Sequence, residues 1–263
     1  MKKVIVLILA VLMLTVCLAG CNTEGTSLAE VKKAGKLVMA TSPDFPPFES
    51  LNADGTVTGI EVEIMELICK ELGVELEIKQ MSFDSVLPGV QAGKYDVGVS
   101  GITVTEKRQK NVLFTDPYCL AAQAIVVLEG SPITGKADLT DKKIAVQSGT
   151  TAESFCMDNG YEISAFSANS DAEMALTTGK VAAWVIDDLT AKEMVEAYNA
   201  TNPDVKLVIL DEAMTTEPYA FAFQKGSDEL VAEINSILSK LIANGTIKAI
   251  FDKYDAPYTS PAN

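Results

Sequence analysis

The sequence predicts an α/β fold in which strands and helices alternate along most of the chain. Short apolar runs with alternating side chains recur between residues 36 and 99, separated by segments with helical apolar spacing. The same strand–helix order returns between residues 143 and 210. A β-α-β-α order of this kind predicts a sheet with mainly parallel strands. At 263 residues the chain is long enough for one large domain or two lobes, and no sequence period indicates a tandem repeat.

The elements of the first half follow a short polar segment, residues 22–27. Their predicted order is strand Lys36–Thr41, proline-rich loop Ser42–Glu49, turn Asn52–Gly55, helix Glu61–Leu72, strand Val74–Lys79, helix Asp84–Ala92 and strand Asp96–Val99. The first helix is predicted by apolar residues at core spacing, and Gly73 ends it. Ligands of such sheets bind at the carboxyl ends of strands, where Ser42, Phe83 and Ser100 fall.

The second half repeats the pattern after an apolar stretch. The predicted order is stretch Ala121–Leu128, strand Lys143–Gln147, a helix from Thr151, strand Tyr161–Ala165, helix Asp171–Thr178, strand Val181–Ile186, helix Leu189–Asn199, strand Lys206–Leu210, segment Ala220–Gln224, and helices Asp228–Ala243 and Ile247–Tyr254.

The composition limits the classes of function. The hydrophobic content is 48% and the charged content 22%, which is typical of globular proteins. The formal net charge of −15 disfavours contact with nucleic acid or with an anionic membrane surface, so we expect no nucleic-acid partner. The chain has no histidine, which excludes histidine general bases, histidine-based triads and histidine metal ligands. We expect neither a metal site nor a cofactor.

The N-terminus has the pattern of a secretory signal. Lys2 and Lys3 precede an apolar run from Val4 to Val16, which is too short for a comfortable membrane span. The sequence Leu-Ala-Gly-Cys at residues 18–21 resembles the bacterial lipobox, which implies cleavage before Cys21 and a lipid on its thiol. The alternative is an ordinary signal peptide with an incidental cysteine.

The remaining cysteines indicate no disulfide framework. Cys17 lies in the signal segment, and Cys69, Cys119 and Cys156 are an odd set without metal-ligand spacing. Cys69 falls on the apolar face of the predicted helix 61–72, so we expect it to be a buried small hydrophobe.

The residues that follow the strand at 96–99 form the strongest candidate for chemistry. Ser100-Gly101 is a turn signal, and Thr105 followed by Glu-Lys-Arg predicts a helix start with Thr105 as N-cap. The helix dipole disfavours Arg108 in a first turn, so Arg108 needs an anion close by. A carboxylate fits its planar fork with two charge-assisted hydrogen bonds. The alternative is a pair between Arg108 and a surface carboxylate.

A series of motifs gives this region a context. They are Phe45-Pro-Pro-Phe-Glu49, Gly59-Ile-Glu-Val-Glu63, Phe83-Asp-Ser-Val-Leu-Pro88, Ser100-Gly-Ile-Thr-x-Thr-x-x-Arg108, Phe114-Thr-Asp-Pro-Tyr118, Val146-Gln-Ser-Gly-Thr-Thr151, Asp187, Thr216-Glu-Pro-Tyr219 and Asn244-Gly-Thr246. Together and in this order they resemble the family-3 extracellular solute-binding proteins, the polar amino-acid-binding proteins that serve ABC importers. The likeness covers nearly all of the mature chain.

This resemblance implies a two-lobed, periplasmic-binding-protein-like fold of type II, in which two hinge crossings join two mixed sheets flanked by helices. The boundaries that it implies are a signal peptide at 1–20, a lipidated tether at 21–27, a first lobe at 28–118 and 219–263, and a second lobe with the hinge strands at 119–218. The protein is then expected to be a lipid-anchored, extracytoplasmic monomer that binds a polar L-amino acid and a membrane permease.

The resemblance also implies ligand contacts. Arg108 would bind the ligand carboxylate with the N–H of Thr103, and the helix start at Gly149-Thr150-Thr151 would face the same group, although these residues would form a plain N-cap in any case. Asp187 would pair with the ammonium beside Ser100 and Gly101, while Asp188 is either the N-cap or the alternative partner. Phe45 and Phe83 match the aromatic positions that enclose the ligand side chain in the glutamine-binding member; Phe48 is assigned to the core.

The distal end of the ligand site departs from the family pattern. Several members have Asp three residues before the loop aromatic, where this chain has Ser42, and that Asp can bind a distal cation. With Gln123 and Gln147 as neutral contacts, the sequence favours a neutral polar ligand unless Asp44 or Glu49 turns inward. Two other functions remain as alternatives. One is a related enzyme such as a cyclohexadienyl dehydratase, which is disfavoured because the chain has no histidine to act as a general acid or base. The other is the sensory domain of a receptor, which is disfavoured because no further domain is expected to follow.

Overall fold

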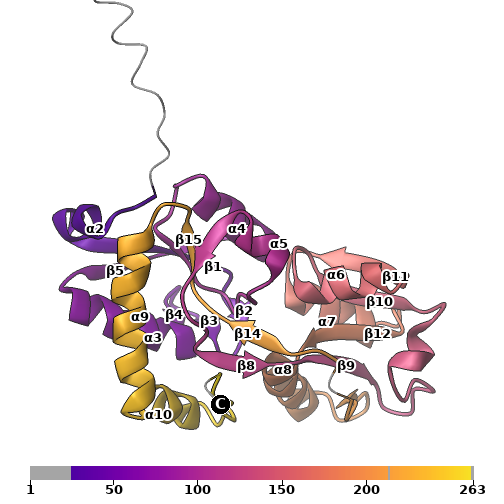
Figure 1. The fold of residues 1–263 in the computed structure, drawn as a ribbon. Helices are drawn as coiled ribbons and strands as arrows, with labels where there is room; N and C mark the ends of the chain where they lie inside the picture. Colours follow the sequence, from indigo (N-terminus) through magenta and orange to yellow (C-terminus); the bar gives the residue numbers. More distant parts are fainter. Residues whose placement is uncertain (1–24, 213, 262–263) are drawn as a thin grey trace, which may run out of the picture.

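The computed structural model describes residues 25–212 and 214–261 of the chain. The predicted signal peptide and the predicted lipidation site, Cys21, lie outside the described residues. The described chain forms two lobes, each a sheet with flanking helices, joined by a pair of short strands (Figure 1). Among these residues no helix combines the length and the apolar character needed to cross a membrane.

The first lobe is built on a five-stranded mixed sheet of order β5-β1-β6-β15-β7. Its strands are β1 (Lys36–Thr41), β5 (Glu75–Gln80), β6 (Val97–Gly98), β7 (Val112–Phe114) and β15 (Ala222–Gln224). β1 pairs in parallel with β5 and β6, whereas β15 runs antiparallel to β6 and β7. The sheet is therefore mixed, because the strand that returns from the second lobe enters it in the opposite direction.

In the part of the chain that the structure describes, six helices belong to this lobe. They are α2 (Leu28–Ala34), α3 (Ile60–Leu72), α4 (Phe83–Gln91), α5 (Glu106–Gln109), α9 (Asp228–Ala243) and α10 (Thr246–Lys253). The apolar stripe of α3 is buried, Cys69 included, and Gly73 ends the helix with a φ of 73°, as the sequence predicts. Helix α2 was not predicted, although Ser27 and Glu30 form the capping box that marks its start.

A small sheet lies beside the first lobe. It comprises β2 (Asp44–Phe45), β3 (Glu49–Leu51) and β4 (Val57–Thr58), with the predicted turn at Asn52–Gly55 between the last two. The sequence predicts only a loop over residues 42–49, because the three prolines obscure strands of two or three residues. Phe48 is fully buried, as predicted, and packs edge-on against Tyr219 and Phe251.

The second lobe has a mixed sheet of order β11-β10-β12-β9-β13. Its elements are β9 (Gln123–Leu128), η1 (Lys136–Leu139), β10 (Lys143–Gln147), α6 (Thr151–Asp158), β11 (Glu162–Phe166), α7 (Asn169–Thr177), β12 (Ala183–Asp187), α8 (Asp188–Thr201) and β13 (Leu207–Ile209). Alternate residues of β9 belong to cores on opposite faces, Val126 with α7 and α8, and Ile125 and Val127 with α6. Helices on both faces explain why this strand is apolar at each of residues 124–128.

Two short strands connect the lobes. β8 (Cys119–Ala121) pairs in antiparallel register with β14 (Glu217–Tyr219), and Figure 1 shows them running between the two sheets. The predicted lobe boundary at 118/119 falls at the start of β8, and the predicted boundary at 218/219 falls within β14. The apolar stretch predicted at 121–128 is divided between β8 and β9, since Ala122 belongs to neither strand.

Candidate functional site

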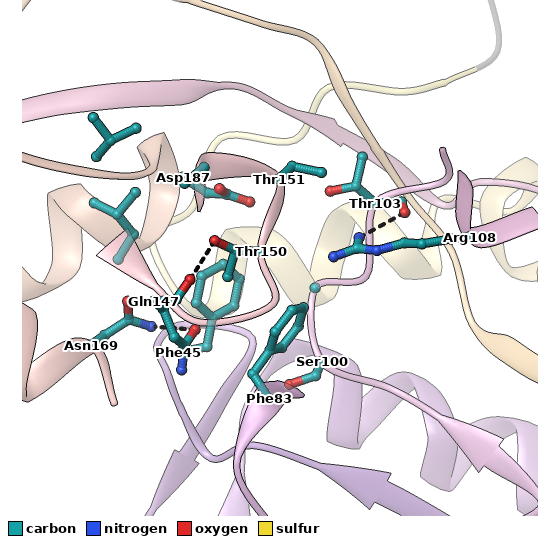
Figure 2. A pocket seen from close by; sticks show the side chains of 14 residues that line it. Phe45, Phe83, Ser100, Thr103, Arg108, Gln147, Thr150, Thr151, Asn169 and Asp187 are labelled. Atoms are coloured by element: carbon teal, nitrogen blue, oxygen red, sulfur yellow. Dashed lines mark hydrogen bonds between the residues drawn. The ribbon is translucent and has the colours of Figure 1, made fainter. Parts of the chain in front are cut away.

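A narrow cavity lies between the lobes, where the carboxyl ends of β1, β6, β10 and β12 approach one another. Figure 2 shows its walls, which come from both lobes. The lining residues are Phe45, Phe83, Ser100, Gly101, Thr103, Arg108, Gln147, Thr150, Thr151, Ala152, Asn169, Val185, Ile186 and Asp187. The residues expected to contact the ligand are in this set, except Ser42, Gln123 and Gly149.

The loop Ser100–Thr103, here called the ligand loop, follows β6 and forms one wall. Gly101 in this loop has a φ of 54°, which side chains with a Cβ rarely adopt. A Cβ built at this position would lie 2.4 Å from Cε1 of Phe45. The close approach of loop and ring therefore requires glycine.

The two aromatic residues of the cavity have different surroundings. Phe45 stacks on Phe48 with ring centroids 5.6 Å apart, and it touches the apolar cores of both lobes. Phe83 begins α4, and Cζ of Arg108 lies 5.6 Å from the centre of its ring. Phe83 therefore supports the guanidinium as well as lining the cavity.

Arg108 reaches from the first lobe toward the second. Its backbone N–H donates to Oγ1 of Thr105, the predicted N-cap, at 3.2 Å. The guanidinium donates from Nη1 to the Thr103 carbonyl at 2.9 Å and from Nη2 to the Gly149 carbonyl at 3.1 Å. Burial lowers the pKa of Arg108, while the charge of Asp187 opposes this shift. Within the described residues Arg108 has no ion pair, so its positive charge is left for another partner.

The second lobe presents the start of α6 to the same space. Thr150 is the N-cap and accepts from the N–H of Glu153 at 3.1 Å, so the plain capping role is present. Thr151 and Ala152 occupy the first turn, whose N–H groups have no intrahelical acceptor. Both residues line the cavity, which places the positive end of a helix dipole against it.

Asp187 is the last residue of β12, and its carboxylate faces the cavity from the second lobe. It is buried and accepts hydrogen bonds from Nε2 of Gln123 and from the hydroxyl of Tyr219 on β14. Burial, with the nearby charge of Glu217, raises the pKa of Asp187 to about 8. Gln123 thus contacts Asp187 and, at 3.2 Å, Oγ1 of Thr151, and it does not line the cavity as expected.

Asp188 has a different role. Its Oδ1 accepts from the N–H of Ala122 at 3.2 Å and from the N–H of Leu189 at 2.8 Å. Of the two neighbouring carboxylates, only that of Asp187 lines the cavity. Asp187 also occupies the N-cap position of α8, but its side chain forms no capping hydrogen bond.

A polar network closes the other end of the cavity. Nε2 of Gln147 lies 3.2 Å from Oδ2 of Asp44, and Nδ2 of Asn169 donates to Oε1 of Gln147 at 3.1 Å. Oδ2 of Asp44 also accepts from the N–H of Asn169 at 2.8 Å. Helix α7 has Ala168 at its N-cap, so a carboxylate of the first lobe caps a helix of the second. Ser42 lies outside the lining and donates to Oδ1 of Asp44 at 2.9 Å.

The residues that line the cavity offer a guanidinium without an ion pair among the described residues, a buried carboxyl group, two aromatic rings and several amides and hydroxyls. This set can bind a small molecule that carries one anionic and one cationic group. No group of acidic or cysteine side chains in residues 25–212 and 214–261 has the arrangement needed to hold a metal ion.

The model of the bacterial extracellular solute-binding proteins, family 3, matches residues 37–256. The match includes both lobes and every residue that lines the cavity. The chain belongs to this family.

Relatives of this solute-binding protein have assigned ligands. It is 30% identical over 259 residues to the arginine-binding extracellular protein ArtP of Bacillus subtilis, covering 97% of this chain and 98% of the relative. It is 29% identical over 231 residues to the L-cystine-binding protein TcyJ of Escherichia coli, covering 86% and 85%. The arginine-bound form of truncated ArgBP from T. maritima is similar in structure, with a TM-score of 0.75, 39% identity, and coverage of 81% of this chain and 99% of that one.

The site of this solute-binding protein contains residues that the sequence did not identify. Asn169 joins the cavity because α7 begins there, and the preceding Ala168 cannot cap the helix. Tyr219 positions Asp187 from the hinge strand β14, although it lies 32 residues away in sequence. The sequence carries two signals for these residues, the missing cap at Ala168 and the family motif at residues 216–219, but neither predicts a contact between the lobes.

Proposed function

We propose that this solute-binding protein captures a polar L-amino acid between its lobes outside the cytoplasm and delivers it to the membrane permease of an ABC importer. One observation carries the proposal. Arg108 has no ion pair within the described residues, and Asp187 has no cationic partner there, yet both line one cavity. An α-amino acid supplies the anion for the first and the cation for the second.

The proposed contacts divide the ligand among the elements. Arg108 and the first-turn N–H groups of α6 bind the carboxylate. Asp187 and the hydroxyl of Ser100 accept from the ammonium, and Phe45 and Phe83 enclose the side chain. Because these groups come from both lobes, the ligand stabilises the closed arrangement by contacts that an open arrangement lacks.

The side chain of the ligand is proposed to be basic, with L-arginine as the first candidate. The carboxylate of Asp44 lies behind Gln147 and Asn169 at one end of the cavity, and it forms no ion pair within the described residues. A distal guanidinium provides the missing cation. The charge of Asp44 therefore favours a basic ligand over the neutral ligand that Ser42 suggested, and the ligand of the relatives ArtP and ArgBP is arginine. L-Glutamine is the neutral competitor.

The experiment is a thermal-shift screen of the mature protein against the standard L-amino acids, followed by calorimetry. At about one hundred times the dissociation constant, a ligand stabilises the protein by roughly 2.7 kcal/mol. We expect L-arginine to give the largest shift. A set of titrations in which no amino acid binds contradicts the proposal, and a preference for L-glutamine contradicts only the assignment of the basic ligand.

We also propose that Cys21 carries the lipid that holds the protein at the outer face of the cell membrane, and that the protein acts as a monomer. The lipobox-like residues 18–21 support the anchor. A single chain provides every wall of the cavity, so ligand binding needs no second copy.

The protein is proposed not to be an enzyme. The raised pKa of Asp187 is the one feature that suits a general acid of the dehydratase type. Its cause is burial beside Glu217, and a ligand ammonium would lower this pKa again. Incubation with a prephenate-like acid is expected to give no product, and measurable turnover would contradict this assignment.

A further inference from the structure

Two glutamates lie buried directly beneath the ligand loop. Glu49 begins β3 and Glu61 is the second residue of α3, and neither side chain is exposed to solvent. They come from the motifs at residues 45–49 and 59–63, and neither glutamate is among the proposed ligand contacts.

Both glutamates hold the ligand loop. The hydroxyl of Ser100 donates to Oε1 of Glu49 at 2.6 Å, and the N–H of Gly101 donates to Oε2 of Glu61 at 2.8 Å. Tyr118 donates its hydroxyl to Oε1 of Glu61 at 2.7 Å. Two adjacent residues of the ligand loop are therefore hydrogen-bonded to two different buried carboxyl groups.

The two carboxyl groups lie close enough for each to shift the pKa of the other. Two carboxylates contain only acceptors, so a hydrogen bond between them requires a proton on one of them. Both oxygens of Glu61 already accept from Gly101 and Tyr118. In the described part of the chain Oε2 of Glu49 is buried without a donor. A proton on this atom, directed at Glu61, satisfies both groups.

No cation compensates the pair. Within the described residues neither glutamate forms an ion pair, and the titratable groups that act on them are Asp44 from β2, Tyr118 and Cys119. Each of these is neutral or negative, so a second negative charge in this buried place is strongly disfavoured.

We propose that Glu49 is a positioning residue of the ligand site. Glu49 remains a neutral acid and donates a hydrogen bond to Glu61, and the two side chains together fix Ser100 and Gly101 in place. The hydroxyl hydrogen of Ser100 is then committed to Glu49, and the N–H of Ser42 occupies one lone pair of the same oxygen at 3.1 Å. The other lone pair is left as an acceptor for a ligand ammonium. This last step rests on the proposed function.

The same arrangement predicts a dependence of stability on pH. Burial, with the charge of Glu61, raises the pKa of Glu49 well above its ordinary range. Since the folded protein then holds a proton that the unfolded chain releases, this group lowers the stability as pH rises above about 4.3, the ordinary pKa of Glu. Replacing the acid by an amide removes this contribution.

The test compares Glu49→Gln with Glu61→Gln. In Glu49→Gln the amide NH₂ donates to Glu61 and its oxygen accepts from Ser100, so the pattern is retained. We expect Glu49→Gln to bind amino acids at least tenfold more tightly than Glu49→Leu, which lacks both hydrogen bonds, and to show a gain in Tm over wild type that grows from pH 5 to pH 9. In Glu61→Gln an NH₂ replaces an acceptor oxygen, so we expect affinity to fall about tenfold or more and Tm to decrease at every pH.

A second measurement detects the proton directly. The infrared spectrum of the ligand-free wild type at pH 7, minus that of Glu49→Gln, is expected to show the carbonyl stretch of a buried protonated carboxyl group, because the band that protonated Asp187 gives in both proteins cancels. Absence of this band, or a Tm gain in Glu49→Gln that does not change with pH, overturns the shared proton. These readouts use no ligand, so they remain decisive if no amino acid binds, a result that would contradict the proposed function instead. Amino-acid binding in a Glu49→Gln protein that falls as far as in Glu61→Gln overturns the positioning role.

Discussion

Replacing Arg108 by alanine tests the anchor of the proposed site. The side chain donates at 2.9 Å to the Thr103 carbonyl in its own lobe and at 3.1 Å to the Gly149 carbonyl in the other. The substitution therefore removes a contact between the lobes as well as the proposed partner of the ligand carboxylate. Loss of one member of a desolvated charge pair costs about 2–5 kcal/mol, which corresponds to an affinity loss of roughly 30-fold to several thousand-fold.

The fold is expected to survive this change. Helix α5 is a single turn without a buried residue, so Arg108→Ala removes no part of a core. Lys107→Ala is the matched control, because it deletes an exposed cation of the same turn that does not line the cavity. Arg108→Lys keeps the charge without the planar fork and is expected to bind more weakly than wild type.

The assay is isothermal calorimetry with the amino acid that gives the largest thermal shift, after circular dichroism has established folding. Arg108→Ala is expected to show no measurable binding, while Lys107→Ala stays within about twofold of wild type. A folded Arg108→Ala protein with a dissociation constant within about threefold of wild type would refute the role of Arg108.

The remaining predictions concern the ammonium, the distal end, the ligand loop and the anchor. Because Asp187 has a pKa of about 8 and must ionise to pair with an ammonium, the affinity of the wild type for the amino acid should rise about tenfold from pH 6 to pH 7. Asp187→Asn should bind weakly, with an affinity that does not change over this pH range. The same pH dependence of affinity in both proteins would mean that Asp187 is structural. Asp44→Asn keeps an acceptor for α7 but loses its charge, so the preference for L-arginine over L-glutamine should fall several-fold, by about 1 kcal/mol. An unchanged ratio of the two dissociation constants would show that Asp44 does not determine specificity. Gly101→Ala should lower Tm more than Gly35→Ala, which shares the positive φ but has no atom within 4 Å of the added Cβ; equal Tm losses would show that contact with Phe45 does not matter. Cys21→Ser should move the protein from the membrane to the soluble fraction, and retention at the membrane would argue against the lipid.

Much of the fold could be predicted because its signals are local. The apolar spacing of α3 and its terminal Gly73, the N-cap Thr105 and the continuous apolar run of β9 each indicate one element from a few neighbouring residues. Helix α2 was missed although its capping box is local as well, since its seven residues bury only Val31. The strands of the small sheet were missed because they are very short and lie among prolines.

The site was predictable to the extent that family motifs carry it. The motifs gave Arg108, the loop around Ser100, and Asp187, but they placed Ser42 rather than Asp44 at the distal end. Asp44 matters because its carboxylate meets the uncapped start of α7 in the other lobe, at Asn169, 125 residues away in sequence. A contact between lobes has no period or spacing in the sequence, so only the folded chain reveals it.

The central claim is that one cavity holds both charged ends of an α-amino acid. The most direct test is calorimetric titration of the mature protein with L-arginine and with agmatine, which keeps the guanidinium but lacks the carboxylate. The account predicts a stoichiometric complex with L-arginine and an affinity for agmatine lower by about 30-fold or more, the loss expected for an unpaired Arg108. Equal affinity for the two compounds, or no binding of L-arginine or of any other amino acid, would contradict it.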